Sequence, residues 1–500
     1  MPKPKVLLKE TQKKKSKHRQ TTPSTADEYL AAAVSFEEAG EKWRGGDAAK
    51  SMRFFNRAIE CYDEGLKRFP DSFDLAYNKS RAQYELTQHP KLLPLISKTI
   101  LEHLEIALQS SRSALALKPD NPDVLFNTAQ ILTSIAEELD ESPHPRLPNS
   151  LQALEEALCY FKKCLQLQEV AILNFREQTA TIVSSSDSMD LDSNDCDDSS
   201  VPIIHDSSTN NSEHSVVQDD RWATVVEPIT DDTLLDTILA SLECLTTFCQ
   251  LVSSECPHEF RKVEKYAHYF VQKLDVNLID KNRTSEVLMI KASLTCAYAT
   301  VQFCSSSIDL ETYSQTIKNA YAEVDLSLNP KGLCDFAESL IAYNKVLRLY
   351  SKGDAHGILV ARWKALTTAQ EYLTSSCKIS SAENLEKIYL ARGDVELLRF
   401  QLGQNEIDFN IARENSTVLL KNAGKYYRGS LAIARNVGAE TIAFEANVKE
   451  MLASALAEGR MYLEEEIMHL SQTRPIFEEA IEDGLVTTDQ LNKLGLKLVF

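Results

Sequence analysis

Residues capable of covalent, metal or acid–base chemistry are scattered along this sequence instead of being grouped in known catalytic motifs. It contains no phosphate-binding loop, H-E-x-x-H helix, G-x-S-x-G elbow or glycine run typical of a dinucleotide site. His258 and His268 are ten residues apart, which is not the spacing of a metal-ligand pair on one helix. Eleven cysteines occur without a C-x-x-C, a pattern typical of reduced thiols in a cytosolic or nuclear protein. We therefore expect no enzymatic activity, no cofactor, no bound metal and no small-molecule substrate.

Amide and basic side chains at a repeated spacing are better candidates for a binding role. Asn78 and Asn127 lie 49 residues apart in matching contexts, and Lys79 and Arg81 lie beside the first of them. An asparagine amide both donates and accepts hydrogen bonds, so it can hold the backbone of a bound peptide. The alternative interpretation is that each amide is satisfied by its own helix, and the residues by themselves favour neither.

Helices that would position these side chains can be predicted from apolar spacing and from helix stops. Apolar and aromatic residues between positions 73 and 86 recur at three- and four-residue steps, which is typical of a packed helix. Pro70 cannot continue the preceding helix, and Asp71 or Ser72 is expected to cap the next one. The same order of stop and new helix returns after Pro119.

These helix pairs recur at a fixed period. Pro70 and Pro119 are 49 residues apart, as are Ala58 and Ala107, and Ala157 follows Ala107 by 50. A constant period of paired helices is the signature of a helical repeat array.

The second helix of each pair resembles that of the tetratricopeptide-repeat (TPR) family, in which a small-x-x-x-aromatic-x-x-small row precedes a proline. The best match is Ala157, Phe161 and Cys164; partial matches are Ala107, Ser111 and Ala114, and Ser51, Phe55 and Ala58. The family period is about 34 residues, so these copies carry about 15 extra residues each. The resemblance implies an all-α fold, a right-handed superhelical array of antiparallel helix pairs.

In that family, first-helix residues line a concave groove that holds a peptide. The residues that the resemblance places there are Asn78, Lys79, Arg81 and Asn127. Some family members grip a partner's C-terminal carboxylate with Lys, Asn and Arg from three successive first helices. Here residues 26–43 offer only Lys42 for such a clamp, and residues 123–139 contain no Lys or Arg. An unpaired buried carboxylate is costly, so we do not expect a carboxylate clamp.

Gly-Asp pairs predict helix boundaries, because glycine favours a C-cap and aspartate an N-cap. They occur at Gly46-Asp47, Gly353-Asp354 and Gly393-Asp394, so the array is expected to continue into the second half of the chain. The last predicted helix spans residues 440–483, with a kink near Pro475.

Residues 1–25 are predicted to form a disordered basic tail. Its densest charge run contains the candidate nuclear-import residues Lys13, Lys14, Lys15, Lys17 and Arg19. The same residues could instead contact RNA, and the sequence leaves both roles open.

Residues 184–220 contain ten acids, eleven serines and no Lys or Arg. The segment has few large apolar groups, and burying them cannot offset the entropy cost of ordering the chain. We therefore predict a disordered acidic insertion. It divides the repeats into segments 26–183 and 221–500. It could be phosphorylated or shield a basic partner, or it could be a neutral loop expansion.

The charge of the chain is strongly asymmetric. Residues 1–20 hold eight basic residues and one acid, which leaves 46 basic and 72 acidic residues in the remainder, a net −26. An acidic body argues against nonspecific nucleic-acid binding by the folded part and favours a basic protein partner.

These observations together predict a non-catalytic scaffold, adaptor or assembly chaperone that binds a basic protein. The alternative is a subunit of an RNA-processing or translation factor that contacts RNA through its basic tail. No uncharged apolar run reaches about 18 residues, and the apolar run Val6–Leu8 is too short for a secretion signal. We therefore expect no membrane contact, no secretion, and a nuclear and cytoplasmic location.

Overall fold

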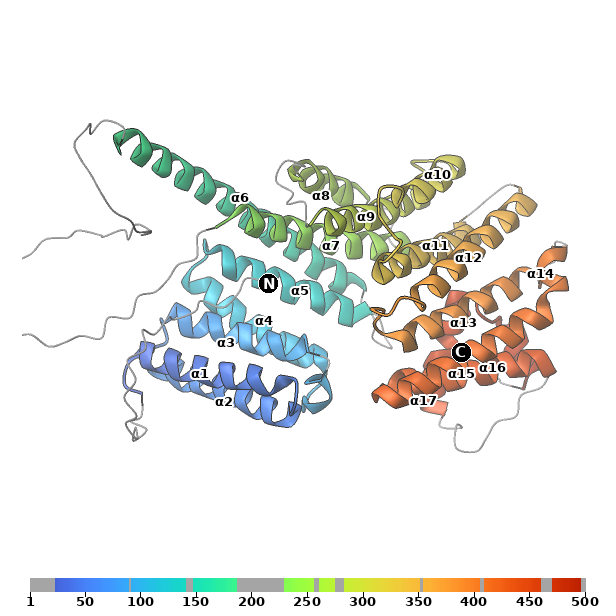
Figure 1. The fold of residues 1–500 in the computed structure, drawn as a ribbon, viewed down its shortest axis with the longest axis horizontal. Helices are drawn as coiled ribbons and strands as arrows, with labels where there is room; N and C mark the ends of the chain where they lie inside the picture. Colours follow the sequence, from blue (N-terminus) through green and yellow to red (C-terminus); the bar gives the residue numbers. More distant parts are fainter. Residues whose placement is uncertain are drawn as a thin grey trace, which may run out of the picture. The chain divides into compact units, whose positions relative to one another are not determined.

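The computed structural model describes residues 23–89, 91–140, 147–186, 229–255, 260–274, 283–350, 354–404, 409–459 and 470–495. Throughout these segments every regular element is a helix, which confirms the predicted all-α fold for them (Figure 1). The predicted import residues (Lys13, Lys14, Lys15, Lys17 and Arg19) and positions 187–220 of the predicted insertion lie outside the described residues.

Chain contacts divide the protein into two units. The N-terminal unit comprises residues 1–131 and 159–237, and the C-terminal unit comprises residues 132–158 and 238–500. The helices from the N-terminus through α7 are α1 (Ala26–Arg44), α2 (Ala48–Arg68), α3 (Phe73–Thr87), α4 (Ile100–Leu117), α5 (Pro122–Asp140), α6 (Leu147–Ser186) and α7 (Asp231–Glu255), with a 3-10 turn at Leu93–Leu95. Those that follow are α8 (Phe260–Lys273), α9 (Thr284–Cys304), α10 (Leu310–Ala320), α11 (Pro330–Tyr350), α12 (Ala355–Ser376), α13 (Leu385–Leu402), α14 (Asn410–Glu414), α15 (Ser416–Val437), α16 (Glu440–Glu458), α17 (Leu470–Asp483) and α18 (Thr488–Lys493).

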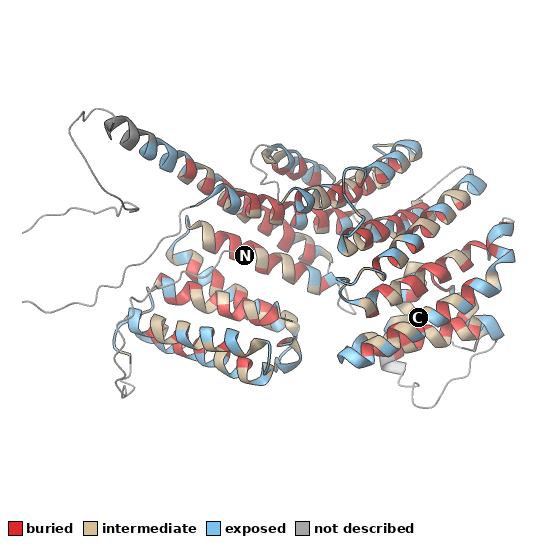
Figure 2. Cartoon of the chain, in the orientation of Figure 1, coloured by how far each residue is buried: buried red, intermediate tan, exposed pale blue. Residues whose placement is uncertain are grey.

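Consecutive helices of the N-terminal unit pack against one another, α1 on α2, α2 on α3 and α3 on α4. Small residues make close contact possible: Ala33 of α1 and Ala58 of α2 are fully buried beside Tyr62. A Cβ on Gly65 would lie 2.9 Å from a side-chain carbon of Leu75, so glycine lets α2 approach α3 closely. Figure 2 shows the buried residues as stripes along the helix faces that meet.

Predicted helix ends of the N-terminal unit are largely confirmed. The α1–α2 turn contains Gly46, and the Asp47 side chain caps α2 by accepting from the backbone N–H of Lys50 at 2.9 Å. The predicted side-chain cap of α3 by Asp71 or Ser72 is wrong, because Ser72 is the N-cap residue and no side-chain cap hydrogen bond forms there. Burial of Phe73 in the first turn anchors the start of α3 instead.

Two boundary predictions in the C-terminal unit are wrong. Gly393 and Asp394 lie inside α13 and do not form a turn. A Cβ on Gly393 would lie 2.4 Å from the ring of Tyr427, so this glycine admits an aromatic ring from α15. The predicted helix over residues 440–483 is divided into α16 and α17, since α16 ends at Gly459, whose φ of +72° is in the left-handed region that favours glycine. By contrast, Asp354 caps α12 as predicted, accepting from the N–H of His356 at 3.1 Å.

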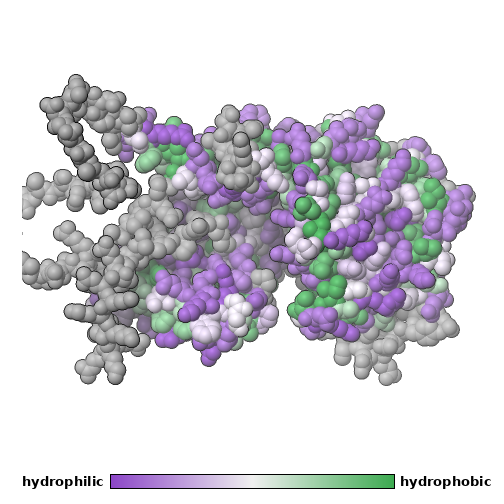
Figure 3. Space-filling view, viewed as in Figure 1, coloured by the Kyte–Doolittle hydropathy of each residue, from purple (hydrophilic) through white to green (hydrophobic). Residues whose placement is uncertain are grey.

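Two described helices, α7 and α9, contain windows apolar and long enough to cross a membrane by length and composition alone. The window in α7 is 72% buried and that in α9 is 39% buried. Core helices of folded proteins pass the same test, so the absence of a membrane contact stays a prediction. Figure 3 shows hydrophilic residues over much of the visible face, with smaller hydrophobic patches between them.

Candidate functional site

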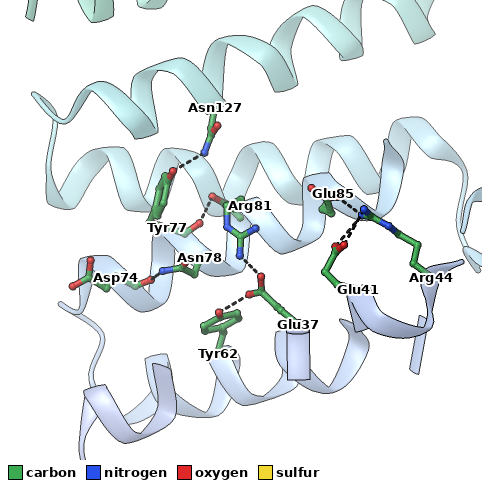
Figure 4. Close-up of polar contacts among 11 residues, drawn as sticks. Glu37, Glu41, Arg44, Tyr62, Asp74, Tyr77, Asn78, Arg81, Glu85 and Asn127 are labelled. Carbon is green, nitrogen blue, oxygen red and sulfur yellow. Dashed lines mark hydrogen bonds and ion pairs between the residues drawn. The ribbon is translucent and has the colours of Figure 1, made fainter. Parts of the chain in front are cut away.

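The predicted binding residues of the N-terminal unit adjoin a buried polar cluster centred on Glu37 of α1 (Figure 4). Tyr62 of α2 donates its hydroxyl hydrogen to Oε1 of Glu37 at 2.5 Å. Arg81 of α3 forms an ion pair with the other carboxylate oxygen of Glu37. One carboxylate thus ties three successive helices together, and we call these three residues the N-terminal cluster.

Electrostatics hold Arg81 of this cluster in its charged form. Desolvation by itself would lower the pKa of its guanidinium, but the Glu37 carboxylate outweighs burial and raises it. Burial raises the pKa of Tyr62, and the adjacent Glu37 carboxylate raises it further, so the phenol stays protonated near neutral pH. The charge of Arg81 is therefore paired with Glu37 inside the fold.

Asn127 makes a second cross-helix link. Its side-chain amide donates to the Tyr77 hydroxyl at 3.1 Å, which joins α5 to α3. Asn127 is only 7% exposed and Tyr77 is 9% exposed, so this hydrogen bond is buried.

The remaining two predicted residues lie closer to solvent. Asn78 is half-buried and donates to the backbone carbonyl of Asp74 in its own helix at 2.8 Å. Lys79 is half-buried and forms an ion pair with Asp63 of α2 at 2.6 Å. The structure thus buries Asn127 and leaves Asn78, Lys79 and Arg81 half-buried, with Arg81 paired to the buried Glu37.

Sequence reasoning missed Glu37 and Tyr62. The signal for Glu37 was present, because it lies four residues after the buried Ala33 and three before the buried Gly40. An acid within the buried stripe of a helix needs a partner, and Tyr62 and Arg81 supply it.

A cluster of the same kind occurs in the C-terminal unit, where Asp394 of α13 takes the place of the acid. The Tyr427 hydroxyl of α15 donates to Asp394 at 2.7 Å, and Lys449 of α16 donates to it at 3.2 Å. Lys449 also pairs with Glu445 of its own helix at 2.7 Å. We call these four residues the C-terminal cluster.

Burial determines the electrostatics of the C-terminal cluster. Desolvation raises the pKa of Asp394, with Lys449 partly opposing it. Desolvation lowers the pKa of Lys449, but the carboxylates of Asp394 and Glu445 outweigh it and raise that pKa overall. Burial also raises the pKa of Tyr427. The charges of Glu37 and Arg81 balance in the N-terminal cluster, whereas Lys449 serves two carboxylates in the C-terminal cluster; in both, the contacts fix helices against each other.

Among the residues that the structure describes, no group of three or more His, Cys, Asp or Glu could hold a metal ion. Cys164, Cys244 and Cys296 are buried, and burial raises the pKa of each thiol, to about 12. Such thiols are poor nucleophiles near neutral pH.

No protein-family model matches the sequence. The chain is 29% identical over 157 residues to UPF0656 protein C926.02 of Schizosaccharomyces pombe; the match covers 30% of this chain and only 34% of that protein's length. It also aligns with a solved circular tandem repeat protein with novel repeat topology and enhanced subunit contact surfaces. That alignment covers 94% of this chain and 99% of the other, with 13% identity and a TM-score of 0.27, too low to support any structural argument.

Proposed function

We propose that this chain is a non-catalytic adaptor or assembly chaperone that binds a basic protein partner. Its helices would form a TPR-like, right-handed array of antiparallel pairs, and it would act in the nucleus and cytoplasm. Support for the array comes from the 49-residue period of the sequence and from the packing of consecutive helices.

The observation that carries the proposed partner class is the distribution of charge. Outside the basic residues 1–20 the net charge is −26, and the ten acids of residues 184–220 account for only part of it. The rest of the chain, residues 21–183 and 221–500, holds 46 basic and 62 acidic residues, a net −16. This excess would steer a basic protein toward the helices and make association weaken as salt rises.

Two of the predicted groove residues suit a surface role and two suit a supporting role. Asn78 and Lys79 are partly open, so they are the proposed contacts for a partner. Arg81 and Asn127 would hold α3 in place beneath them through Glu37 and Tyr77.

Affinity capture with the full chain as bait tests this proposal. The extract is treated with ribonuclease and the bound proteins are eluted in steps of rising salt, then identified by mass spectrometry. We expect basic proteins to be retained after ribonuclease and released by salt. Retention that disappears with ribonuclease, and with replacement of Lys13, Lys14, Lys15 and Lys17 by Ala, would instead establish the RNA-factor alternative.

A further inference from the structure

The C-terminal unit contains a groove of about 590 Å³ whose walls come from α9 and α11. Ser293 and Ala297 lie on the α9 wall, and Ile481 and Glu482 of α17 lie at the edge of the groove. We call this cavity the α9–α11 groove. Its volume is of the size that holds a small molecule or a few side chains of a peptide, on the order of 300–1,000 Å³.

One face of α11 presents both charged and apolar side chains to the groove. Asp335 is half-buried, whereas Glu338, Ala342 and Leu349 are exposed and recur at helical spacing on the same face. Leu349, at 56% exposed, is among the largest open apolar side chains of the described residues. The distance along the helix axis from Asp335 to Leu349 is about 21 Å, since each residue rises about 1.5 Å. That length matches an extended segment of about six residues.

The two basic side chains of the groove are already engaged within the protein. Lys345 pairs with Asp483 at 2.8 Å. Arg348 donates to the backbone carbonyl of Glu482. Neither cation is therefore placed to neutralise the carboxylates at the other end of α11.

The carboxylates of Asp335 and Glu338 have no cation in direct contact among the described residues. Within the described residues neither carboxylate takes part in a hydrogen bond or ion pair, and Lys331 and Lys387 act on them only at longer range. Burial raises the pKa of the half-buried Asp335 carboxyl group. The exposed Glu338 is only partly withdrawn from water, and this desolvation together with the Asp335 carboxylate raises its pKa. A cation placed between them would offset this cost.

We propose that the α9–α11 groove binds a short peptide segment of the basic partner. A lysine or arginine of that segment would pair with Asp335 and Glu338, and an apolar side chain would contact Ala342 and Leu349. This assignment rests on the proposed function. It adds to that function a binding site and the type of peptide that the site recognises. Charge complementarity at one end and exposed apolar surface at the other select a peptide that is both basic and apolar.

A selection from random twelve-residue peptides displayed on phage, with the full chain as target, tests the groove. We expect selected peptides to be enriched in Lys or Arg close to an apolar residue. One selected peptide is then synthesised and its Kd measured by isothermal titration calorimetry. Asp335→Asn combined with Glu338→Gln is expected to weaken it about tenfold or more, because two ionic contacts are lost.

Two further variants separate the groove from general charge and from folding. Ala342→Trp fills the groove from an exposed position and is expected to weaken the peptide similarly while thermal unfolding is unchanged. Glu371→Gln with Glu383→Gln also removes two negative charges, but from exposed positions outside the groove. This control variant should change Kd by less than about twofold.

The groove assignment would be overturned if the selected peptides showed no enrichment in Lys or Arg. It would also be overturned if the groove variants bound the peptide as tightly as the wild type. The affinity capture keeps this failure distinct from failure of the proposed function. If the wild-type chain retains basic proteins and the groove variants retain them equally, the function stands and the site lies elsewhere. If the wild-type chain retains none, the proposed function itself fails.

Discussion

Each of the two polar clusters pairs carboxylates with a cation at a helix interface, but the cations differ. In the N-terminal cluster Arg81 pairs with one carboxylate, Glu37, and in the C-terminal cluster Lys449 lies between two, Asp394 and Glu445. Each cluster also contains a fully buried tyrosine that donates to the central acid.

The two helix interfaces differ in how strongly their stability depends on the cation. Arginine is planar and charged at all ordinary pH values, whereas lysine is a compact point charge that can lose its proton. Lys449 is only 3% exposed at its side chain, against 17% for Arg81. We therefore expect the C-terminal cluster to depend more on its cation and to respond to alkaline pH.

The largest effect is expected from removing the cations. Lys449→Met leaves two carboxylates without their partner and should destabilise the helices around it by about 3–5 kcal/mol. Arg81→Met should cost less, because it strands one carboxylate instead of two. Hydrogen–deuterium exchange over α13, α15 and α16, and separately over α1 to α3, measures the two losses. Equal losses would show that the number of carboxylates served does not matter.

Close helix contacts should give the next effect. Gly393→Ala places a Cβ 2.4 Å from the Tyr427 ring, and Gly40→Ala places one 2.9 Å from the Phe55 ring. Overpacking of this kind costs about 1–3 kcal/mol, and we expect Gly393→Ala to lie at the upper end. Gly45→Ala, where nothing lies within 4 Å, is the matched control and should be neutral or stabilising. Thermal unfolding orders the three variants, and any other order would contradict the packing argument.

Alkaline pH should distinguish the two cations. Because the folded-state pKa of Lys449 is raised above 10.5, its stabilisation is complete below that pH and is lost as pH rises toward the folded value. The slope is at most about 1.4 kcal/mol per pH unit for one proton. Lys449→Arg should remove this part of the pH dependence, and Arg81→Lys should introduce it in the N-terminal cluster. Denaturant unfolding between about pH 10 and 12 measures both slopes, and unchanged slopes would show that neither cation controls them.

The smallest effect separates the two asparagines. Asn127→Ala removes the buried hydrogen bond to Tyr77 and should cost about 1 kcal/mol. Asn78→Ala removes a partly open bond within one helix and should cost much less. Chemical denaturation of the two single variants gives the difference. Binding of a captured basic partner should show the reverse order if Asn78 is a direct contact, since Asn127 has no open surface to offer.

Local features of the fold were predictable because they depend on neighbours in the chain. The all-helical class, the α1–α2 turn and the cap at Asp354 follow from caps, breakers and apolar spacing. Gly393-Asp394 has the same local signature as the α1–α2 turn. It lies inside a helix because the ring of Tyr427, 34 positions away along the chain, packs against the glycine.

Which polar residues pair with one another depends on the tertiary structure. Asp394 and Tyr427 are 33 residues apart, and Glu37 and Tyr62 are 25 apart, so no constant spacing connects the two clusters. The helices, the acidic body and the repeat period follow from the sequence alone. Folding then gave these side chains different surroundings: it enclosed Asn127, paired the half-buried Arg81 with Glu37, left Asn78 half-buried, and put Asp335 and Glu338 together on a groove wall. The physical reason is that the role of a carboxylate or amide depends on the protein groups that replace the water around it.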